Sequence, residues 1–393
     1  MNIYFHVDEL KRDSIVASAL KKKFRALGHN LVYGNRITGP ILKLFHNAFD
    51  IIVFPRPHFI HDMLGDDSLN WDQEIVMLSS ENLGIICKDY EVMARTLLED
   101  TYFNDDTRYI DKIAAFCLWG PRQKQAIEMF APDVHKKCSI IGHPRHDKRC
   151  IGSKSKSIKN AKTKIGLITR QPLLNDFLKR SPVESIISSS SSLEAHYSYN
   201  NQATGDSLLL QDSDPVDEVY MQAVDIKILL QLLLKLNKEG HEIHLKVHPR
   251  EDRELWVNVV KKFNLNVTLA HWCMPFSHWV QEMDYLIGPS STSFYDCCIA
   301  GVQPICTRKI NKNRDLHIRK FSEENGALMQ HIVSPDSIDG VIDIVSKKNK
   351  GFELSDEIKQ VLLNETNYPD SNNSINKLVE LCLDLKKEDK ASS

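Results

Sequence analysis

The sequence predicts an α/β protein made of two domains, each with a parallel sheet covered by helices. Three observations favour this fold class. The chain has 393 residues, which is too long for one ordinary core. Short apolar runs alternate with amphipathic segments of helical length along most of it. Several of the runs are apolar without alternation, which is typical of strands covered on both faces.

The first domain is expected over residues 1–150. Its predicted strands are "NIYFHV", "FDIIVFP", "EIVMLSS", "KIAAFCLWG" and "CSIIG". The segments "ELKRDSIVASALKKKFRALG" and "PRQKQAIEMFA" have the apolar spacing of helices and end near helix breakers. A strand followed by a helix, repeated in this way, indicates a parallel sheet.

Residues 151–164 are predicted to be a basic linker, because "GSKSKSIKNAKTK" is rich in Lys and Ser and almost free of large apolar side chains. A patch for anionic lipid is the alternative. The second domain is expected over residues 165–360, with strands "KIGLIT", "HEIHLKV", "DYLIG" and "QPICT". A serine-rich insertion after the first of these strands has the composition of a lid. Residues 361–393 are expected to form a C-terminal helix and tail that could pack on the first domain.

The composition restricts the class of protein. With 42% hydrophobic and 26% charged residues and a formal net charge of -2, the chain is typical of a soluble globular protein and lacks the basic excess of a nucleic-acid binder. The nine cysteines show no paired CxxC spacing, so buried reduced thiols are expected rather than a zinc site. No apolar run reaches the ~18 residues of a spanning helix, and the N-terminus is not typical of a signal peptide. A cytoplasmic protein is expected, with peripheral membrane contact left open.

Polar groups follow two strands of the second domain, where ligands of doubly wound sheets bind. The strand "EIHLKV" ends at His248, Pro249 and Arg250, and an Arg fork suits phosphate. The strand "DYLIG" is followed by hydroxyl groups that open a helix, whose free N–H groups favour an anion. These hydroxyl residues are Ser290, Ser291, Thr292 and Ser293. A two-sided phosphate grip is the functional interpretation, and a solvent-facing loop with simple helix capping is the structural one.

Two carboxylates are candidates for catalysis. Glu81 follows the strand "EIVMLSS" and is the first candidate for a general acid, base or nucleophile, with a surface turn as its alternative. Asp176, in "TRQPLLND", is the reserve, although a helix cap is its more ordinary role. Arg170 opens the same segment and is a candidate for substrate binding. A second His-Pro-Arg trio, with His143 and Arg145, is assigned either to substrate contact or to a hinge.

Four segments resemble a known family. "FCLWGPRQKQAIEMF" and "CSIIGHPRHD" are similar to the end of the N-terminal domain in bacterial capsule and surface-carbohydrate biosynthesis proteins. "KVHPRE" and "GPSSTSFYDCCIAGVQPI" resemble the His-Pro and Ser/Thr motifs of GT-B transferases that use cytidine-activated donors, including Kdo transferases and some bacterial sialyltransferases. The resemblance implies two Rossmann-like domains facing a central cleft, with the acceptor on the first and the nucleotide sugar on the second. It also implies that His248, Pro249, Arg250 and residues 290–293 hold the nucleotide phosphate.

The implied function is a metal-independent glycosyltransferase that moves a sugar from a CMP-activated donor, with CMP-Kdo as a candidate, to a lipopolysaccharide or capsule glycan. Donors fixed on the leaving phosphate would stabilise its growing charge, so neither a metal nor a cofactor is expected. The related sialyltransferases carry an acidic pair before Gly, whereas "SSENLG" has Glu81 alone. Three alternatives stay open: a CDP-glycerol or CDP-ribitol polyol-phosphate transferase, a nucleotide-sugar 2-epimerase, and a non-catalytic partner of a polysaccharide synthase. The expected location is the cytoplasm, at most at the inner face of its membrane, with a glycan or glycolipid acceptor as partner.

Overall fold

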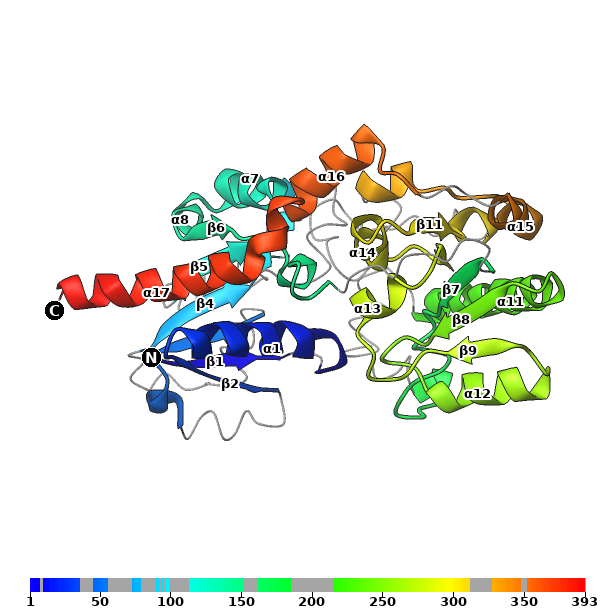
Figure 1. The fold of residues 1–393 in the computed structure, drawn as a ribbon, viewed down its shortest axis with the longest axis horizontal. Coiled ribbons are helices and arrows are strands. Elements are labelled where there is room, and N and C mark those ends of the chain that lie inside the picture. Colours follow the sequence, from blue (N-terminus) through cyan, green and yellow to red (C-terminus); the bar gives the residue numbers. More distant parts are fainter. Residues whose placement is uncertain are drawn as a thin grey trace, which may run out of the picture. The chain divides into compact units, whose positions relative to one another are not determined.

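The computed structural model divides the chain into two compact units (Figure 1). Unit 1 consists of Met1–Gly152, Gly326–Leu328 and Ser355–Ser393, and unit 2 consists of Ser153–Asn325 and Met329–Leu354. The predicted second domain, 165–360, therefore includes the start of helix α16 (Asp356–Thr366), which belongs to unit 1 in the structure. The structure describes residues 1–7, 10–35, 45–55, 73–78, 90–91, 93–94, 97–98, 113–151, 162–184, 215–311, 327–347 and 352–392.

Unit 1 contains a six-stranded parallel sheet with the order β2-β1-β3-β4-β5-β6. Its strands are β1 (Asn2–His6), β2 (Asn30–Gly34), β3 (Ile51–Phe54), β4 (Glu74–Leu78), β5 (Ile113–Leu118) and β6 (Cys138–Ile140). Every residue of β3 is buried, as its unbroken apolar sequence predicts. The edge strand β2 was not predicted. Three of its five residues are exposed, so its sequence shows no regular apolar pattern.

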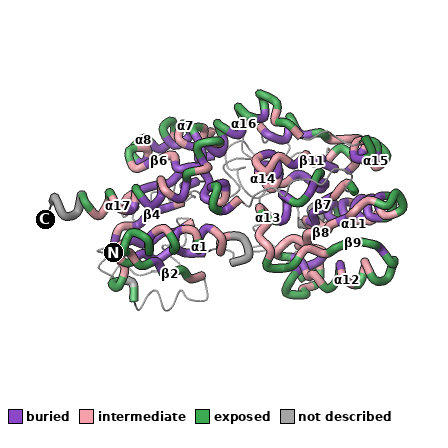
Figure 2. Tube along the Cα trace, viewed as in Figure 1, coloured by how far each residue is buried: buried purple, intermediate pink, exposed green. Residues whose placement is uncertain are grey.

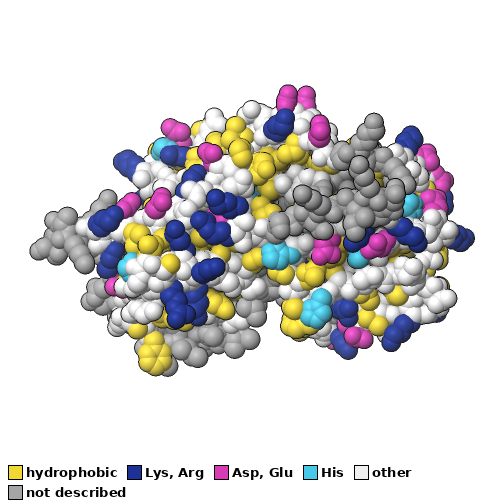
Figure 3. All heavy atoms as spheres, in the orientation of Figure 1, with side chains coloured by type: hydrophobic (Ala, Val, Ile, Leu, Met, Phe, Trp, Pro, Cys, Tyr) yellow, Lys and Arg dark blue, Asp and Glu magenta, His cyan; other side chains and the backbone are white. Residues whose placement is uncertain are grey.

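The helices of unit 1 cover this sheet. They are α1 (Leu10–Ala26), α7 (Pro121–Phe130), α8 (Pro132–His135), α16 (Asp356–Thr366) and α17 (Ser374–Ser392). Leu20 and Phe24 of α1 share one apolar cluster with Leu378 of α17, so the C-terminal helix completes the core of the first sheet. The opposite face of α1 is polar and exposes Lys21 and Lys22, and Figure 3 shows Lys and Arg side chains gathered over α1 and the adjacent part of α17.

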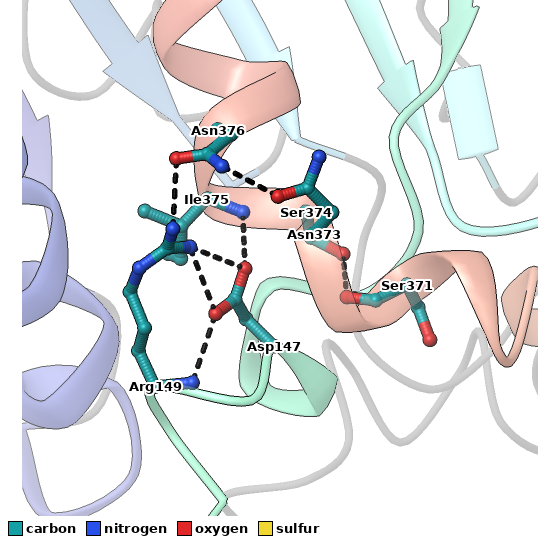
Figure 4. A network of polar contacts seen from close by, with 7 residues as sticks. All are labelled: Asp147, Arg149, Ser371, Asn373, Ser374, Ile375 and Asn376. Carbon is teal, nitrogen blue, oxygen red and sulfur yellow. Dashed lines mark hydrogen bonds and ion pairs between the residues drawn. The ribbon is translucent and has the colours of Figure 1, made fainter.

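A buried carboxylate attaches the C-terminal segment to unit 1 (Figure 4). Asp147 Oδ2 accepts a hydrogen bond from the backbone N–H of Ile375 at 2.9 Å, and Asp147 Oδ1 accepts one from Arg149 Nη1 at 3.1 Å. Gly142 has a φ of +80°, and a Cβ there would lie 2.6 Å from the Cβ of Ser371. This close approach needs glycine, and it brings the start of α17 onto the end of β6.

Unit 2 contains a five-stranded parallel sheet with the order β11-β10-β7-β8-β9. Its strands are β7 (Lys164–Ile168), β8 (Glu242–Lys246), β9 (Val267–Leu269), β10 (Tyr285–Gly288) and β11 (Gln303–Cys306). Its helices are α11 (Pro215–Lys238), α12 (Arg253–Lys262), α13 (Phe276–Val280), α14 (Ser293–Ile299) and α15 (Ile338–Ser346). The strands β7, β10 and β11 are mostly buried, whereas the edge strand β9 has no buried residue (Figure 2). The prediction of an α/β chain with two parallel-sheet domains is confirmed.

The end of β10 is covered by a side chain from the end of β7, its neighbour in the sheet. A Cβ built on Gly288 would be 2.3 Å from Cγ1 of Ile168, so only glycine fits at the end of β10. The Ile168 side chain therefore packs directly over Gly288, at the two strand ends that precede the polar residues of the candidate site. The three-residue strand β9 was not predicted, because so short a run carries no periodicity.

Candidate functional site

Three neighbouring strands of unit 2 bring most of the predicted site residues together. The strand β7 lies between β8 and β10, and all three are parallel, so their carboxyl ends meet at one edge of the sheet. Arg170 follows β7, the His-Pro-Arg trio follows β8, and the hydroxyl run follows β10. We call this set the phosphate edge, and it consists of Arg170, His248, Pro249, Arg250, Ser290, Ser291, Thr292 and Ser293.

The end of β8 is a tight turn held by local hydrogen bonds. The backbone N–H of His248 donates to Thr169 Oγ1 at 2.8 Å, which joins this turn to the end of β7. The backbone N–H of Arg250 donates to His248 Nδ1 at 3.2 Å. Because Nδ1 accepts, the neutral imidazole carries its proton on Nε2, which is therefore a donor. Arg250 itself is exposed, so its guanidinium reaches solvent at the edge of the sheet.

The end of β10 is likewise joined to the end of β7 by a hydrogen bond. Arg170 Nη1 donates to the carbonyl oxygen of Ser290 at 2.5 Å. Ser290 is fully buried, and its hydroxyl has no hydrogen-bond partner among the residues that the structure describes. Ser291 Oγ accepts from the backbone N–H of Ser293 at 3.2 Å, whereas Thr292 makes no side-chain cap bond. One of the four hydroxyl residues therefore supports the start of α14, and simple capping does not account for the whole run.

A carboxylate that the sequence reasoning overlooked, Glu251, lies beneath the phosphate edge and is only 3% exposed. Glu251 Oε1 accepts from the backbone N–H of Gln171 at 2.7 Å. Glu251 Oε2 accepts from Trp256 Nε1 at 3.1 Å and from Asn175 Nδ2 at 3.4 Å. A further hydrogen bond comes from the hydroxyl of Thr169.

These contacts fix two strand ends to each other, because Gln171 follows Arg170 directly and Glu251 follows Arg250 directly. Burial raises the pKa of Glu251, while its hydrogen bonds act in the opposite direction. In sequence, Glu251 lies in the charged run from Arg250 to Glu254, a pattern that indicates surface residues. Its only sequence signal was the strand end itself.

Asp176, the reserve catalytic residue, is 7% exposed and forms an ion pair with Arg180. Its Oδ1 also accepts from the backbone N–H of Leu178 at 3.3 Å. The hydrogen bond from Arg180 lowers the pKa of Asp176, and a carboxylate with a lowered pKa is a weaker base. The geometry favours a turn-forming role, which is close to the capping role weighed against catalysis.

The remaining predicted residues lie elsewhere. Glu81 lies outside the described residues. His143 and Arg145 belong to unit 1, where His143 is buried and its ring centroid is 3.9 Å from that of Trp119. Both His143 nitrogens face Arg145, at 3.1 Å from its backbone nitrogen and 3.2 Å from Nε. These contacts account for the order of the second His-Pro-Arg trio without a ligand.

The described part of the chain offers neither a metal centre nor a membrane-spanning helix. No group of three or more His, Cys, Asp or Glu side chains there could hold a metal ion. None of its helices is long and apolar enough to cross a membrane. Among the cysteines in this part, Cys273 is exposed and the others are buried. Burial raises the pKa of Cys297 and Cys298, next to the phosphate edge, so both are held as neutral thiols.

Comparison with known proteins supports the fold. No family model matches the chain, and no curated protein matches it. A variant of the wall teichoic acid polymerase TagF has a similar structure, with a TM-score of 0.56 and 10% identity over 99% of this chain and 89% of that chain. A TagF variant soaked with CDPG gives a TM-score of 0.51 and 12% identity, over 98% of this chain and 89% of that chain.

A UDP-GlcNAc 2-epimerase from Neisseria meningitidis, bound to UDP-GlcNAc, gives a TM-score of 0.49 and 9% identity over 98% of this chain and 100% of that chain. The similarity to TagF spans nearly the whole of both chains. The protein therefore has a fold of the GT-B type, with two α/β domains that each contain a parallel sheet.

Proposed function

We propose that this protein is a transferase that uses a cytidine-nucleotide-activated donor and binds the donor phosphate at the phosphate edge. The convergence of three strand ends carries the proposal: Arg170, His248 and Ser290 come from β7, β8 and β10, and hydrogen bonds of 2.5 Å and 2.8 Å join the ends of these strands. Cationic and hydroxyl donors that converge at the carboxyl edge of a parallel sheet form the kind of site that binds nucleotide phosphate.

The chemistry follows from the leaving group. Whether a sugar leaves CMP or a polyol phosphate leaves CDP-alcohol, negative charge grows on the phosphate of the departing CMP. Arg170 and Arg250 supply positive charge there, and His248 Nε2 supplies a further donor. Donors that are already in place stabilise this charge more in the transition state than in the ground state. We therefore propose that the reaction needs no metal.

Two donor classes share this chemistry, and the comparisons favour one of them. A TagF structure was obtained with CDPG, which supports CDP-glycerol or a related CDP-polyol as the donor. A CMP-sugar such as CMP-Kdo, the donor that the sequence motifs suggest, is supported by those motifs alone. We therefore propose a CDP-polyol transferase that extends a cell-surface polymer as the first function to test. A CMP-sugar glycosyltransferase is the second.

The test is a thermal-shift titration of the purified protein with CMP, CDP, UDP, GDP and ADP, with and without Mg²⁺. A ligand that binds only the folded state raises the unfolding midpoint by mass action. We expect stabilisation by CMP and CDP in the absence of Mg²⁺. His248→Ala and Ser291→Ala should reduce it, whereas the control His278→Ala, on α13, should not. No response to any nucleotide would contradict the proposal and favour a non-catalytic partner.

Turnover then separates the donor classes. CDP-glycerol and CMP-Kdo both release CMP, so the transferred group must be identified on the acceptor by mass spectrometry. Product formed without any acceptor would instead indicate an epimerase. We propose Glu81 as the catalytic carboxylate, and Glu81→Gln should abolish turnover while leaving CMP affinity unchanged. Normal turnover in this variant would remove Glu81 from the mechanism.

A further inference from the structure

An aromatic side chain is exposed beside the phosphate edge, in the loop that follows β7. Phe177 is 58% exposed, and the neighbouring Leu178 is 67% exposed. The backbone N–H of Phe177 donates to the carbonyl oxygen of Arg250 at 2.9 Å. This bond holds the Phe177 backbone against the turn that carries the predicted phosphate ligands, although the two residues are far apart in sequence.

Backbone pairing determines which side chains share a face here. Asp176 and Glu251 form an antiparallel bridge, and the backbone N–H of Asp252 donates to the carbonyl oxygen of Asn175 at 3.0 Å. Phe177 is therefore directly opposite Arg250. Opposed residues of an antiparallel pair have Cα atoms about 5.5 Å apart, so Phe177 and Arg250 are backbone neighbours just beyond the bridge, where both segments enter turns.

The burial of these residues agrees with the pairing. Asp176 and Glu251 are both buried, so their face of the bridge points into unit 2. Phe177 and Arg250 are both exposed, so the other face points to solvent. The pairing thus places the backbones of Phe177 and Arg250 next to each other, with both residues exposed on the outer surface of the phosphate edge. Because Glu251 is fixed by hydrogen bonds from Gln171 and Trp256, the backbone that carries Arg250 and, through the bridge, Phe177 is held in place before any ligand binds.

We propose that Phe177 is the platform on which the nucleobase stacks when Arg250 holds the phosphate of the same nucleotide. This inference rests on the proposed function, because it requires a nucleotide at the phosphate edge. A flat ring next to a cationic fork matches the two ends of a nucleotide, a planar heteroaromatic base and an anionic phosphate. Every base has a π face, so Phe177 contributes affinity without selecting cytosine, and selection must come from other residues.

The experiment compares a ligand that has the base with one that lacks it. CMP and ribose 5-phosphate are titrated into the wild-type protein, Phe177→Ala, Phe177→Trp and the control Leu178→Ala, with Kd taken from the dose dependence of the thermal shift. We expect Phe177→Ala to weaken CMP binding about tenfold, within the range of base–aromatic stacking. Ribose 5-phosphate binding should stay unchanged. Phe177→Trp should keep the affinity for CMP, and Leu178→Ala should behave as the wild type does.

The other outcomes separate a failure of the stacking platform from a failure of the proposed function. If Phe177→Ala binds CMP as tightly as the wild type, or loses CMP and ribose 5-phosphate by the same factor, the stacking platform is overturned while the proposed function stands. If the wild-type protein binds no nucleotide, the proposed function fails, and the platform fails with it. Because Phe177 is exposed, its replacement should not unfold unit 2, and an unchanged midpoint without ligand checks this.

Discussion

Glu251→Gln tests how the phosphate edge is built. The substitution keeps the shape of the side chain but replaces one carboxylate oxygen by an NH₂ group. Every partner that the structure gives this carboxylate is a donor: the backbone N–H of Gln171, the indole N–H of Trp256, the amide of Asn175 and the hydroxyl of Thr169. Whichever way the new amide turns, its NH₂ group faces at least one buried N–H donor.

The size of the effect follows from that conflict. A buried donor without an acceptor costs about 1–3 kcal/mol. Removing a buried charge acts in the opposite direction, because burial raises the pKa of Glu251. We therefore expect a net loss of about 2 kcal/mol in the free energy of unfolding of unit 2. For a unit of this size, that loss lowers the unfolding midpoint by about 6 °C.

The assay is thermal unfolding followed by circular dichroism, with Glu254→Gln as the control. Glu254 is exposed in the first turn of α12, only a few residues from Glu251, and its variant should unfold within about 1 °C of the wild type. Glu251→Gln should also weaken CMP binding, because Glu251 joins the two strand ends that carry Arg170 and Arg250. An unchanged midpoint for Glu251→Gln would refute the assigned hydrogen bonds.

Three further predictions concern unit 1. Burial raises the pKa of Glu365 to about 7 against the attraction of Arg122, so the native state holds this proton more tightly than the unfolded state. The unfolding midpoint of the wild type should fall as the pH rises from about 4.5 to about 7, and the midpoint of Glu365→Gln, measured by thermal unfolding over the same pH range, should not. If both proteins show the same pH dependence, the burial argument is contradicted. Asp147→Ala leaves the N–H of Ile375 without its acceptor, so urea unfolding should show a loss of about 2 kcal/mol, with Asp384→Ala unaffected as its exposed control. Gly120→Ala places a Cβ 2.6 Å from the backbone carbonyl carbon of Glu365, so this variant should unfold at a lower temperature than the wild type. An unchanged unfolding midpoint would show that α16 does not pack against Gly120.

The alternation of strands and helices could be predicted from the sequence because burial leaves a local pattern. The runs "IIVF" and "YLIG" are buried throughout and carry no charged residue, which is typical of strands covered on both faces, and a parallel sheet follows from that pattern. The polar residues after β7, β8 and β10 were recognisable for the same reason: they begin where the apolar run stops. The short strands β2 and β9 were missed because their apolar runs are too brief or too exposed to show a period.

The sequence by itself determined which residues lie at strand ends and which chemistry they bring, since residue type and periodicity are local properties. Only the tertiary structure decided which strand ends are neighbours. The order β10-β7-β8 places Arg170 between the two halves of the predicted grip, and Gly288 allows that contact. The burial of Glu251 and the pairing of Phe177 with Arg250 depend on the same order. A hydrophobic pattern indicates that one face of a strand or helix is buried. Which other segment covers that face is determined by packing between segments far apart in the chain.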